Sequence, residues 1–338
     1  MKYYTKNLPI NVNKYYIIAI LFLFTSIILG IIFGSTKLSV IDIINILFKE
    51  NENNIKTNIL IYVRLPRVLG SLFCGASLAV SGCIIQNVLF NKLASPSVIG
   101  VNAGAGFAVA LCSAIGFIGG WQISLFAFLG AFVTVFLVSF VSKKWDASSA
   151  TVILLGIAIN SLLGAFTDMI TTFNPDISII NNDFKIGDFS AVTYSKIIPS
   201  VIIIIFSFLI ISMLSKDLDV LSLGDDNAKG LGLNINITRI LFLILASLLA
   251  GAAVSICGLL SFVGLLVPHA IRRKCTTDNK HLIPLCALFG GGFVTLCDTI
   301  SRVLFSPYEL PVGILMAFLG APFFIYILIK RKGEHNYD

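Results

Sequence analysis

The stretch Ile240–Cys257, ILFLILASLLAGAAVSIC, contains eighteen consecutive residues without a single charged side chain. About 20 apolar residues are needed to cross the hydrocarbon core of a bilayer as a helix, so this run predicts a transmembrane helix. Similar runs flank it on both sides, at 15–33, 68–89, 98–118, 121–141, 149–171, 197–214, 259–271, 282–300 and 311–329. The sequence therefore predicts an all-α polytopic membrane protein with ten transmembrane helices.

One boundary in this count is open. The run 259–271 is short for a span and follows Ile240–Cys257 almost directly, near Ser255–Gly258. One long helix there would reduce the count to nine.

Composition supports the membrane assignment. Hydrophobic residues make up 57% of the 338 residues and charged residues only 12%, whereas soluble domains carry about 25% charged residues. So few charges could not cover the apolar surface of a soluble protein, which excludes a soluble enzyme, a disordered chain and a secreted disulfide scaffold. Because ten spans use most of the chain, residues 1–338 are predicted to form one transmembrane domain, and any ATPase must be another polypeptide.

The basic residues predict the orientation of the chain. The net charge is +7, and the basic residues gather in short clusters between the apolar runs rather than on one nucleic-acid-binding face. With ten spans and both termini cytoplasmic, sixteen of the 24 Lys and Arg residues fall on the inner side, in keeping with the positive-inside rule. Because the basic residues are distributed in this way, we expect no nucleic-acid partner. Frequent Ile, Asn and Lys are typical of AT-rich bacterial genomes, so we expect a multi-pass protein of the bacterial plasma membrane.

Motifs for chemistry are absent from the sequence. It contains no GxxxxGK[ST], GxSxG or HExxH motif, and its seven cysteines include no CxxC pair. We therefore expect no enzymatic activity, catalytic residue, metal site or cofactor. The acidic residues nearest the span interiors, Asp168 and Asp298, fall towards the outer ends of their helices. This pattern weighs against an ion-coupled carrier, and Asp298 could instead pair with Arg302 one turn later.

The longest inner loop, residues 216–239, reads KDLDVLSLGDDNAKGLGLNINITR. Asp225 or Asp226 could cap a short helix that ends near Gly232. The residues Leu218, Leu221, Leu223 and Leu231 could then form one apolar face. Such an element is suited to dock a soluble partner, although an ordinary solvated loop is the alternative.

Five groups of short motifs follow one another from about residue 64 to 326. They are Arg64–Arg67 with Gly75–Gln86; Asn91–Pro96 with Ile99–Ala105; Leu223–Gly232; Phe262–His269 with Arg272; and Asp298, Arg302, Leu310–Gly313 and Gly320–Phe324. Each motif is weak alone, but together and at these spacings they resemble the FecCD family of permeases, which includes the vitamin B12 permease BtuC and the iron–siderophore and haem permeases.

The resemblance implies a BtuC-like fold and a set of partners. These are two ATP-binding subunits, an extracytoplasmic substrate-binding lipoprotein, and a second permease copy or a paralogue, all in contact with membrane lipid. The implied function is that of the permease subunit of a type II ABC importer, which moves a metal chelate inward with ATP hydrolysed by the partner. Ferric siderophore is favoured as cargo and would serve iron uptake, while haem and cobalamin remain open. A proton-coupled secondary transporter is the alternative.

The resemblance also assigns roles to individual residues. Arg64, Arg67 and Arg302 match family arginines that receive acidic residues of the binding protein, although helix anchoring or the Asp298 pair would also explain them. The segment 218–233 matches the ATPase-coupling helices, with Leu218, Leu223, Asp225, Ala228, Leu231 and Gly232 as its contact residues. Ser148 and Ser149 match the region of the cytoplasmic gate, although Ser148 could equally be a simple helix cap.

Overall fold

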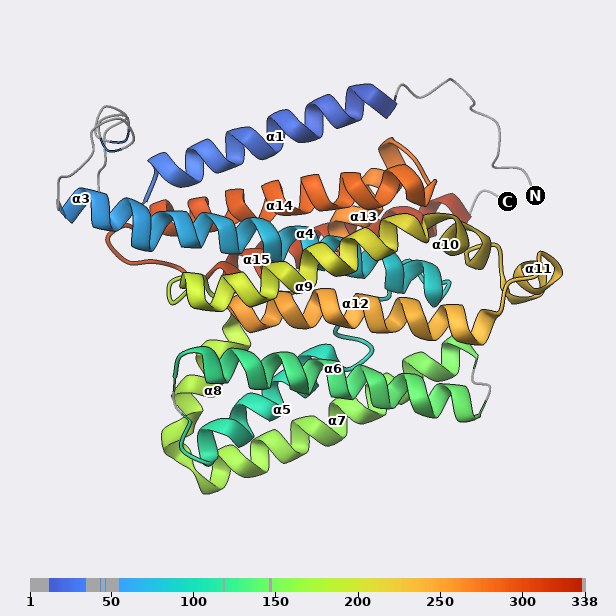
Figure 1. The fold of residues 1–338 in the computed structure, drawn as a ribbon, viewed down its shortest axis with the longest axis horizontal. Coiled ribbons are helices and arrows are strands. Elements are labelled where there is room, and N and C mark those ends of the chain that lie inside the picture. The colour runs from blue at the N-terminus through green and yellow to red at the C-terminus, as the bar shows by residue number, and fades with distance from the viewer. Residues whose placement is uncertain are drawn as a thin grey trace.

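The computed structural model describes residues 12–34, 43, 46, 55–117, 119–145 and 148–335, with Lys143 and 326–335 described as backbone only. Much of the stretch 34–67 between the first two predicted spans lies outside these residues, as do Lys2 and Lys6, which the ten-span topology puts on the inner side. Every element found in the described residues is helical (Figure 1). The longer helices are α1 (Val12–Ile32), α4 (Leu65–Val88), α5 (Val101–Ala114), α6 (Trp121–Lys144), α7 (Ser149–Phe173), α9 (Tyr194–Met213), α12 (Ile235–Cys257), α13 (Val263–Lys274), α14 (Asn279–Leu304) and α15 (Val312–His335).

Short helical segments join or extend these helices. They are α3 (Ile55–Asn58) and η1 (Ile59–Arg64), which lead into α4; η2 (Pro175–Ile177) and α8 (Ser178–Ile186) after α7; and α10 (Ser215–Leu221) and α11 (Asp225–Gly230) before α12. Each predicted apolar run corresponds to a separate helix. In particular, α12 ends at Cys257 and α13 begins at Val263, so the long continuous helix considered for this region does not form.

Seven helices of the described chain are long and apolar enough to span a membrane, and α5 and the first part of α15 are shorter apolar helices. The helix α13 has only 12 residues and ends in three basic ones. The full count of ten transmembrane helices, the orientation of the termini and the single-domain organisation therefore remain predictions.

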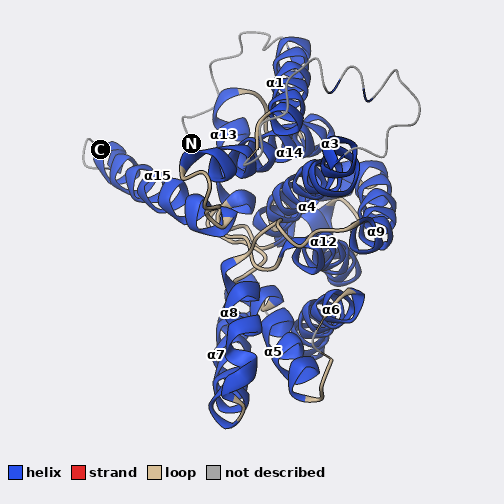
Figure 2. Cartoon of the chain, turned by 90° about the vertical axis from the view of Figure 1, so that its left-hand side faces the viewer, coloured by secondary structure: helices blue, strands red, loops and turns tan. Residues whose placement is uncertain are grey.

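The helices α4 and α12 form the centre of the bundle. In each of these helices, 78% of the most apolar 18-residue stretch is buried, whereas in α1 and α7 only 17% of the corresponding stretch is buried. The helix α4 packs against α12, α13 and α14, and α1 covers α14 from outside (Figures 1 and 2). A second group, α5, α6 and α7, joins the centre mainly through the contact of α6 with α12. The central helices are thus shielded from lipid by the peripheral ones.

Glycine pairs set the close packing of the centre. A methyl group on Gly82 of α4 would overlap the carbonyl oxygen of Gly264 in α13, and one on Gly75 would overlap that of Gly290 in α14. Small residues allow helix backbones to approach closely where lipid gives no hydrophobic driving force. These contacts hold the short helix α13 against α4.

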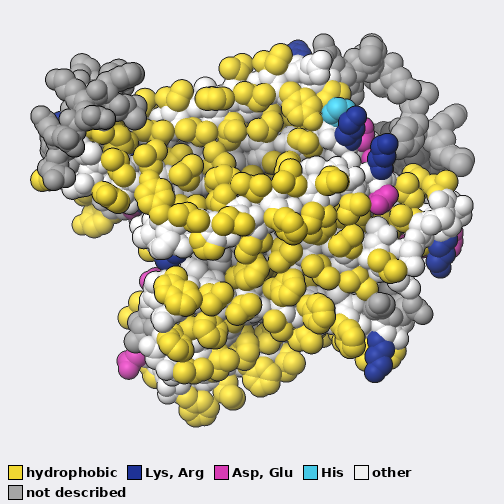
Figure 3. Space-filling view, in the orientation of Figure 1, with side chains coloured by type: hydrophobic (Ala, Val, Ile, Leu, Met, Phe, Trp, Pro, Cys, Tyr) yellow, Lys and Arg dark blue, Asp and Glu magenta, His cyan; other side chains and the backbone are white. Residues whose placement is uncertain are grey.

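The two ends of the molecule differ in charge. The first residue of α1 and the last of α15 lie at the same end as α10 and α11 (Figure 1). On the face shown in Figure 3, Lys and Arg side chains gather mainly at that end, and apolar side chains cover the walls. We call it the inner end, as the charge pattern predicts, and the opposite end the outer end.

Candidate functional site

A buried cluster of charges lies at the outer end of the bundle. Arg67 of α4 and Asp298 of α14 are only 4% and 0% exposed. The Nε atom of Arg67 donates to Oδ1 of Asp298 at 3.0 Å, and Nε of Arg302 lies 3.2 Å from Oδ2. Asp298 is therefore shared by two guanidinium groups, which compensates a charge that would be costly to bury alone. The i,i+4 pair of Asp298 and Arg302 that the sequence suggests is confirmed.

Two further carboxylates complete this cluster at its exposed edge. Nη1 of Arg67 donates to Oε2 of Glu309 at 2.6 Å, and Nη2 lies 3.7 Å from Asp188. The side chains of Glu309 and Asp188 are 31% and 27% exposed. Neither residue was predicted as part of a site, because no sequence spacing relates Glu309 or Asp188 to Arg67.

The arginines also hold the outer end of α1. Nη1 of Arg64 donates to the carbonyl oxygens of Ile31 and Ile32, each at 2.6 Å, and Nη2 of Arg302 donates to Gly30 at 3.1 Å. The last carbonyl groups of a helix have no partner within the helix and carry partial negative charge. Buried guanidinium groups therefore satisfy the end of α1.

These contacts correct the physical basis of one prediction. Arg64, Arg67 and Arg302, expected to offer their charges to a binding protein, are 2%, 4% and 2% exposed and are held by groups of their own chain. These arginines can be buried because carboxylate and carbonyl oxygens of their own chain compensate the charge. An unpaired guanidinium group would remain in contact with water. A docking role for the three arginines stays a prediction. Their burial means that none of them presents a freely exposed guanidinium group to a partner.

A second polar cluster lies at the inner end, where α10 meets the bundle. Oδ1 of Asp219 in α10 accepts hydrogen bonds from the backbone N of Asn279 at 3.0 Å and from its Nδ2 at 2.7 Å. Oδ1 of Asn279 accepts in turn from Nδ2 of Asn87 at 2.7 Å. Burial raises the pKa of Asp219, and the hydrogen bonds from Asn279 oppose that shift. The residues thus link α10 to the start of α14 and the end of α4.

The same chain of hydrogen bonds continues to α13. Nη2 of Arg272 donates to Oδ1 of Asn87 at 3.1 Å, and Nη1 donates to the side chain of Gln86. Nε2 of Gln86 donates to the carbonyl oxygen of Gly264 at 2.9 Å. We call this set, Asp219, Asn279, Asn87, Arg272 and Gln86, the inner polar chain. It connects α10 to the first turn of α13 through side chains far apart in the sequence.

The predicted coupling segment does form two short helices, α10 and α11, but its leucines do not share one face. Leu218 and Leu221 are 0% exposed, whereas Leu223 and Leu231 are 56% and 64% exposed. The single apolar face was a wrong prediction, because α10 packs into the bundle and leaves the later leucines outside.

The capping of α11 also differs from the prediction. The N-cap is Gly224, with φ of +102°, and Asp225 lies in the first turn. Its carboxylate accepts from Nη2 of Arg239 in α12 at 2.7 Å. Ala228 is fully buried and Gly232 has φ of +83° after the helix, a conformation that favours glycine. The segment is thus fixed to the bundle, and on its exposed side Leu223 and Leu231 lie among polar residues.

Ser148 is the N-cap of α7. Its Oγ accepts from the backbone N of Thr151 at 3.3 Å, and Ser149 is the first residue of the helix. The capping alternative is confirmed for Ser148, and the gate role of Ser148 and Ser149 remains a prediction.

Comparison with known families places this arrangement. The model of the FecCD transport family matches residues 20–330. The chain belongs to the FecCD transport family. It is 35% identical over 334 residues to YvrB, an uncharacterised ABC transporter permease of Bacillus subtilis, with 94% of this chain and 95% of YvrB covered.

Other similar members of the FecCD family have named substrates. The haemin permease HmuU of Yersinia pestis is 32% identical, over 86% of this chain and 89% of HmuU. The vitamin B12 permease BtuC of Yersinia pseudotuberculosis is 34% identical, over 80% and 82%. A solved structure, described as an inward-facing conformation of a metal-chelate type ABC transporter, superposes with a TM-score of 0.82 at 28% identity, covering 94% of this chain and 99% of that one. This FecCD protein is therefore an ABC transporter permease of the inner membrane with several membrane-crossing helices.

Proposed function

We propose that this FecCD permease is the membrane channel of a type II ABC importer that carries a metal chelate into the cytoplasm. Two ATP-binding subunits would bind at the inner end, a substrate-binding lipoprotein at the outer end, and a second permease, either a copy or a paralogue, would complete the path. Ferric siderophore is the favoured cargo, with haem and cobalamin as the other candidates. The observation that carries the proposal is the projecting pair α10 and α11 in a chain that matches the FecCD family over residues 20–330.

The form of this pair suits an ATPase site. Leu223 and Leu231 are mostly exposed at the inner end, while Leu218 and Asp225 fix the segment to the bundle. Exposed apolar side chains on a rigid, projecting element are typical of a surface that a partner covers. We infer that the ATPase buries Leu223 and Leu231.

The outer charged cluster argues against the proton-coupled alternative. Asp298 is the only carboxylate fully buried in the described part of the chain, and both of its oxygens face arginines. A proton relay needs carboxylates that can take up and release protons along the path. Asp298 is instead held in place between the guanidinium groups of Arg67 and Arg302 and does not belong to a series of carboxylates along a path.

The outer cluster also supports a site for the binding protein. Asp188 and Glu309 form its exposed edge, with the positive charge of Arg67 directly behind them. Charged groups of both signs at an interface favour one orientation of a partner. We propose that the lipoprotein docks over this edge, with Arg64, Arg67 and Arg302 positioned beneath it.

Energy coupling is tested in proteoliposomes that contain this permease, its ATPase and its binding protein. Haem, ferric citrate and cobalamin serve as labelled cargoes. Uptake of one of them is expected to require internal ATP and to continue when an uncoupler removes the proton gradient. Uptake at the wild-type rate with a hydrolysis-deficient ATPase would instead support a secondary transporter.

The ATPase contact is tested by changing both exposed leucines. In the double variant Leu223→Asp and Leu231→Asp, co-purification of the ATPase is expected to fall by at least about 100-fold, because each buried leucine side chain contributes about 1.5–3 kcal/mol. Both side chains are exposed in the isolated chain, so folding should be retained. Leu304→Asp, equally exposed at the outer end, is the matched control. Wild-type ATPase binding by the double variant would refute the docking role of α10 and α11.

A further inference from the structure

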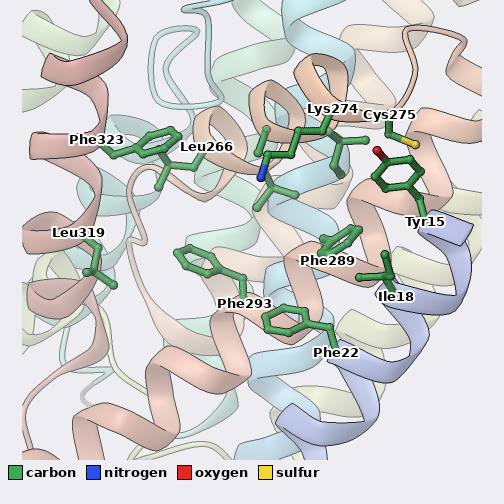
Figure 4. Close-up of a pocket in the computed structure, with 13 residues that line it drawn as sticks. Tyr15, Ile18, Phe22, Leu266, Lys274, Cys275, Phe289, Phe293, Leu319 and Phe323 are labelled. Carbon is green, nitrogen blue, oxygen red and sulfur yellow. The ribbon is translucent and has the colours of Figure 1, made fainter. Parts of the chain in front are cut away.

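A deep apolar groove runs between α1, α13, α14 and α15. Its volume is about 620 Å³, within the range of sites that hold small molecules. Phe22 of α1, Phe289 and Phe293 of α14, and Leu319 and Phe323 of α15 form its walls (Figure 4). The helices α1 and α14 are both apolar and long enough to span the membrane. The groove therefore opens on the part of the molecule that faces acyl chains.

One cation lies in this groove. Lys274, the last residue of α13, lines it, and its side chain extends among the apolar groups in Figure 4. The neighbouring Arg272 is engaged in the inner polar chain. Lys274, in contrast, forms no ion pair with any residue of the described chain. An ammonium group beside an apolar surface without a carboxylate partner is a site for an anion.

The position of Lys274 along the bundle limits what that anion can be. Lys274 ends α13 close to the start of α14, which is the inner end of the bundle. Tyr15, in the first turn of α1, lines the groove at the same level. Tyrosines and lysines at the ends of membrane helices lie at the level of the lipid headgroups. The groove thus has a cationic entrance at the headgroup level and an apolar body.

We propose that this groove binds an anionic phospholipid of the cytoplasmic leaflet, with the phosphate on Lys274 and an acyl chain along Phe22, Phe289 and Phe293. The apolar walls match a hydrocarbon chain, and the single ammonium group matches a phosphate. A free phosphate would match only the entrance. The cytoplasmic leaflet is rich in anionic lipids, and each nearby Lys or Arg favours them.

The lipid would act as a wedge under α15. This helix leaves the rest of the bundle at an angle (Figure 2), and Leu319 and Phe323 face the groove from its side. An acyl chain in the groove would fill the space between α15 and α1 that packing within the chain leaves open. The site would therefore support the position of α15.

The test uses the purified full-length permease and native mass spectrometry. The protein is equilibrated with equal amounts of dioleoyl-phosphatidylglycerol and dioleoyl-phosphatidylcholine, and the lipids that remain bound are counted. The wild type is expected to prefer phosphatidylglycerol by about fivefold, which corresponds to one cation near the headgroup. Lys274→Ala should remove the preference. Lys216→Ala is the matched control, since Lys216 is exposed at the same end but does not line the groove, and it should keep the preference.

A second variant tests the acyl chain. Ala270 is exposed and lines the groove, so Ala270→Trp fills it without disturbing the core and should lower the retention of both lipids. Equal loss of preference in Lys274→Ala and Lys216→Ala would indicate diffuse attraction and overturn the proposal. Unchanged lipid retention in Ala270→Trp would also overturn it. A wild-type dimer that retains no lipid would assign the groove to a second copy instead.

Discussion

Replacing Asp298 with alanine is expected to lower the free energy of unfolding by about 3–5 kcal/mol, because it removes one partner of a buried charge network. Arg67 and Arg302 would then remain buried beside one another, 4% and 2% exposed, without the carboxylate between them. This is among the largest effects that a single substitution can have in this chain. Unfolding in detergent micelles, followed by circular dichroism against denaturant, measures it.

Two further variants separate the causes of this loss. Asp298→Asn keeps the shape and one acceptor oxygen but removes the charge, so it should have an intermediate effect. Asp168→Ala is the matched control, since that side chain is 77% exposed and only 3.9 Å from Lys185, and exposed pairs contribute little. If Asp168→Ala and Asp298→Ala had the same effect, the outer cluster would not stabilise the fold.

Replacing Asn279 with alanine is expected to lower the amount of cargo transported per ATP by about tenfold or more while leaving the ATPase bound. Asn279 is the link at which the inner polar chain passes from Asp219 to Asn87. A hydrogen bond to a charged group contributes about 1.5–3 kcal/mol, so its loss should loosen α10 from α4 and α13. This expectation rests on the proposed function.

The experiment compares uptake and ATP hydrolysis in the same proteoliposomes. Asp219→Asn, which can still accept from Asn279, should retain most of the coupling. Asp217→Ala lies on the same short helix outside the inner polar chain and is the control. A parallel fall in ATPase binding and uptake in Asn279→Ala would show that this residue only supports assembly. Failure of the wild type to couple uptake to ATP would count against the proposed function itself.

The helices could be predicted from the sequence because hydropathy depends only on local composition. Even the break between α12 and α13 lies where the short run 259–271 meets the run Ile240–Cys257. Gly258, with φ of +76°, ends α12 there. The depth of each helix could not be predicted. The runs of α1 and α12 are both strongly apolar, yet α1 lies at the edge of the bundle and α12 at its centre.

The sites were predictable only where the partners are close in the sequence. The pair of Asp298 and Arg302 follows from a spacing of four residues. Arg67 and Asp298 are 231 residues apart, and only the packing of α4 against α14 brings them together. Short helical structure in the segment 218–233 was predictable, but which of its leucines are buried depends on where α10 meets α4 and α14.

The outer charged cluster also has a consequence for biosynthesis. Arg67 enters the membrane in an early helix, and 231 residues must be synthesised before Asp298 follows. At about 5–20 residues per second, this takes roughly 10–50 s. During that time the nascent chain holds an arginine that would be costly at the centre of the bilayer. Arg67 lies in the first turn of α4, at the outer end. Its guanidinium group can therefore reach the headgroup layer until α14 is inserted. The position of Arg67 along its helix thus makes the late arrival of Asp298 compatible with stepwise insertion.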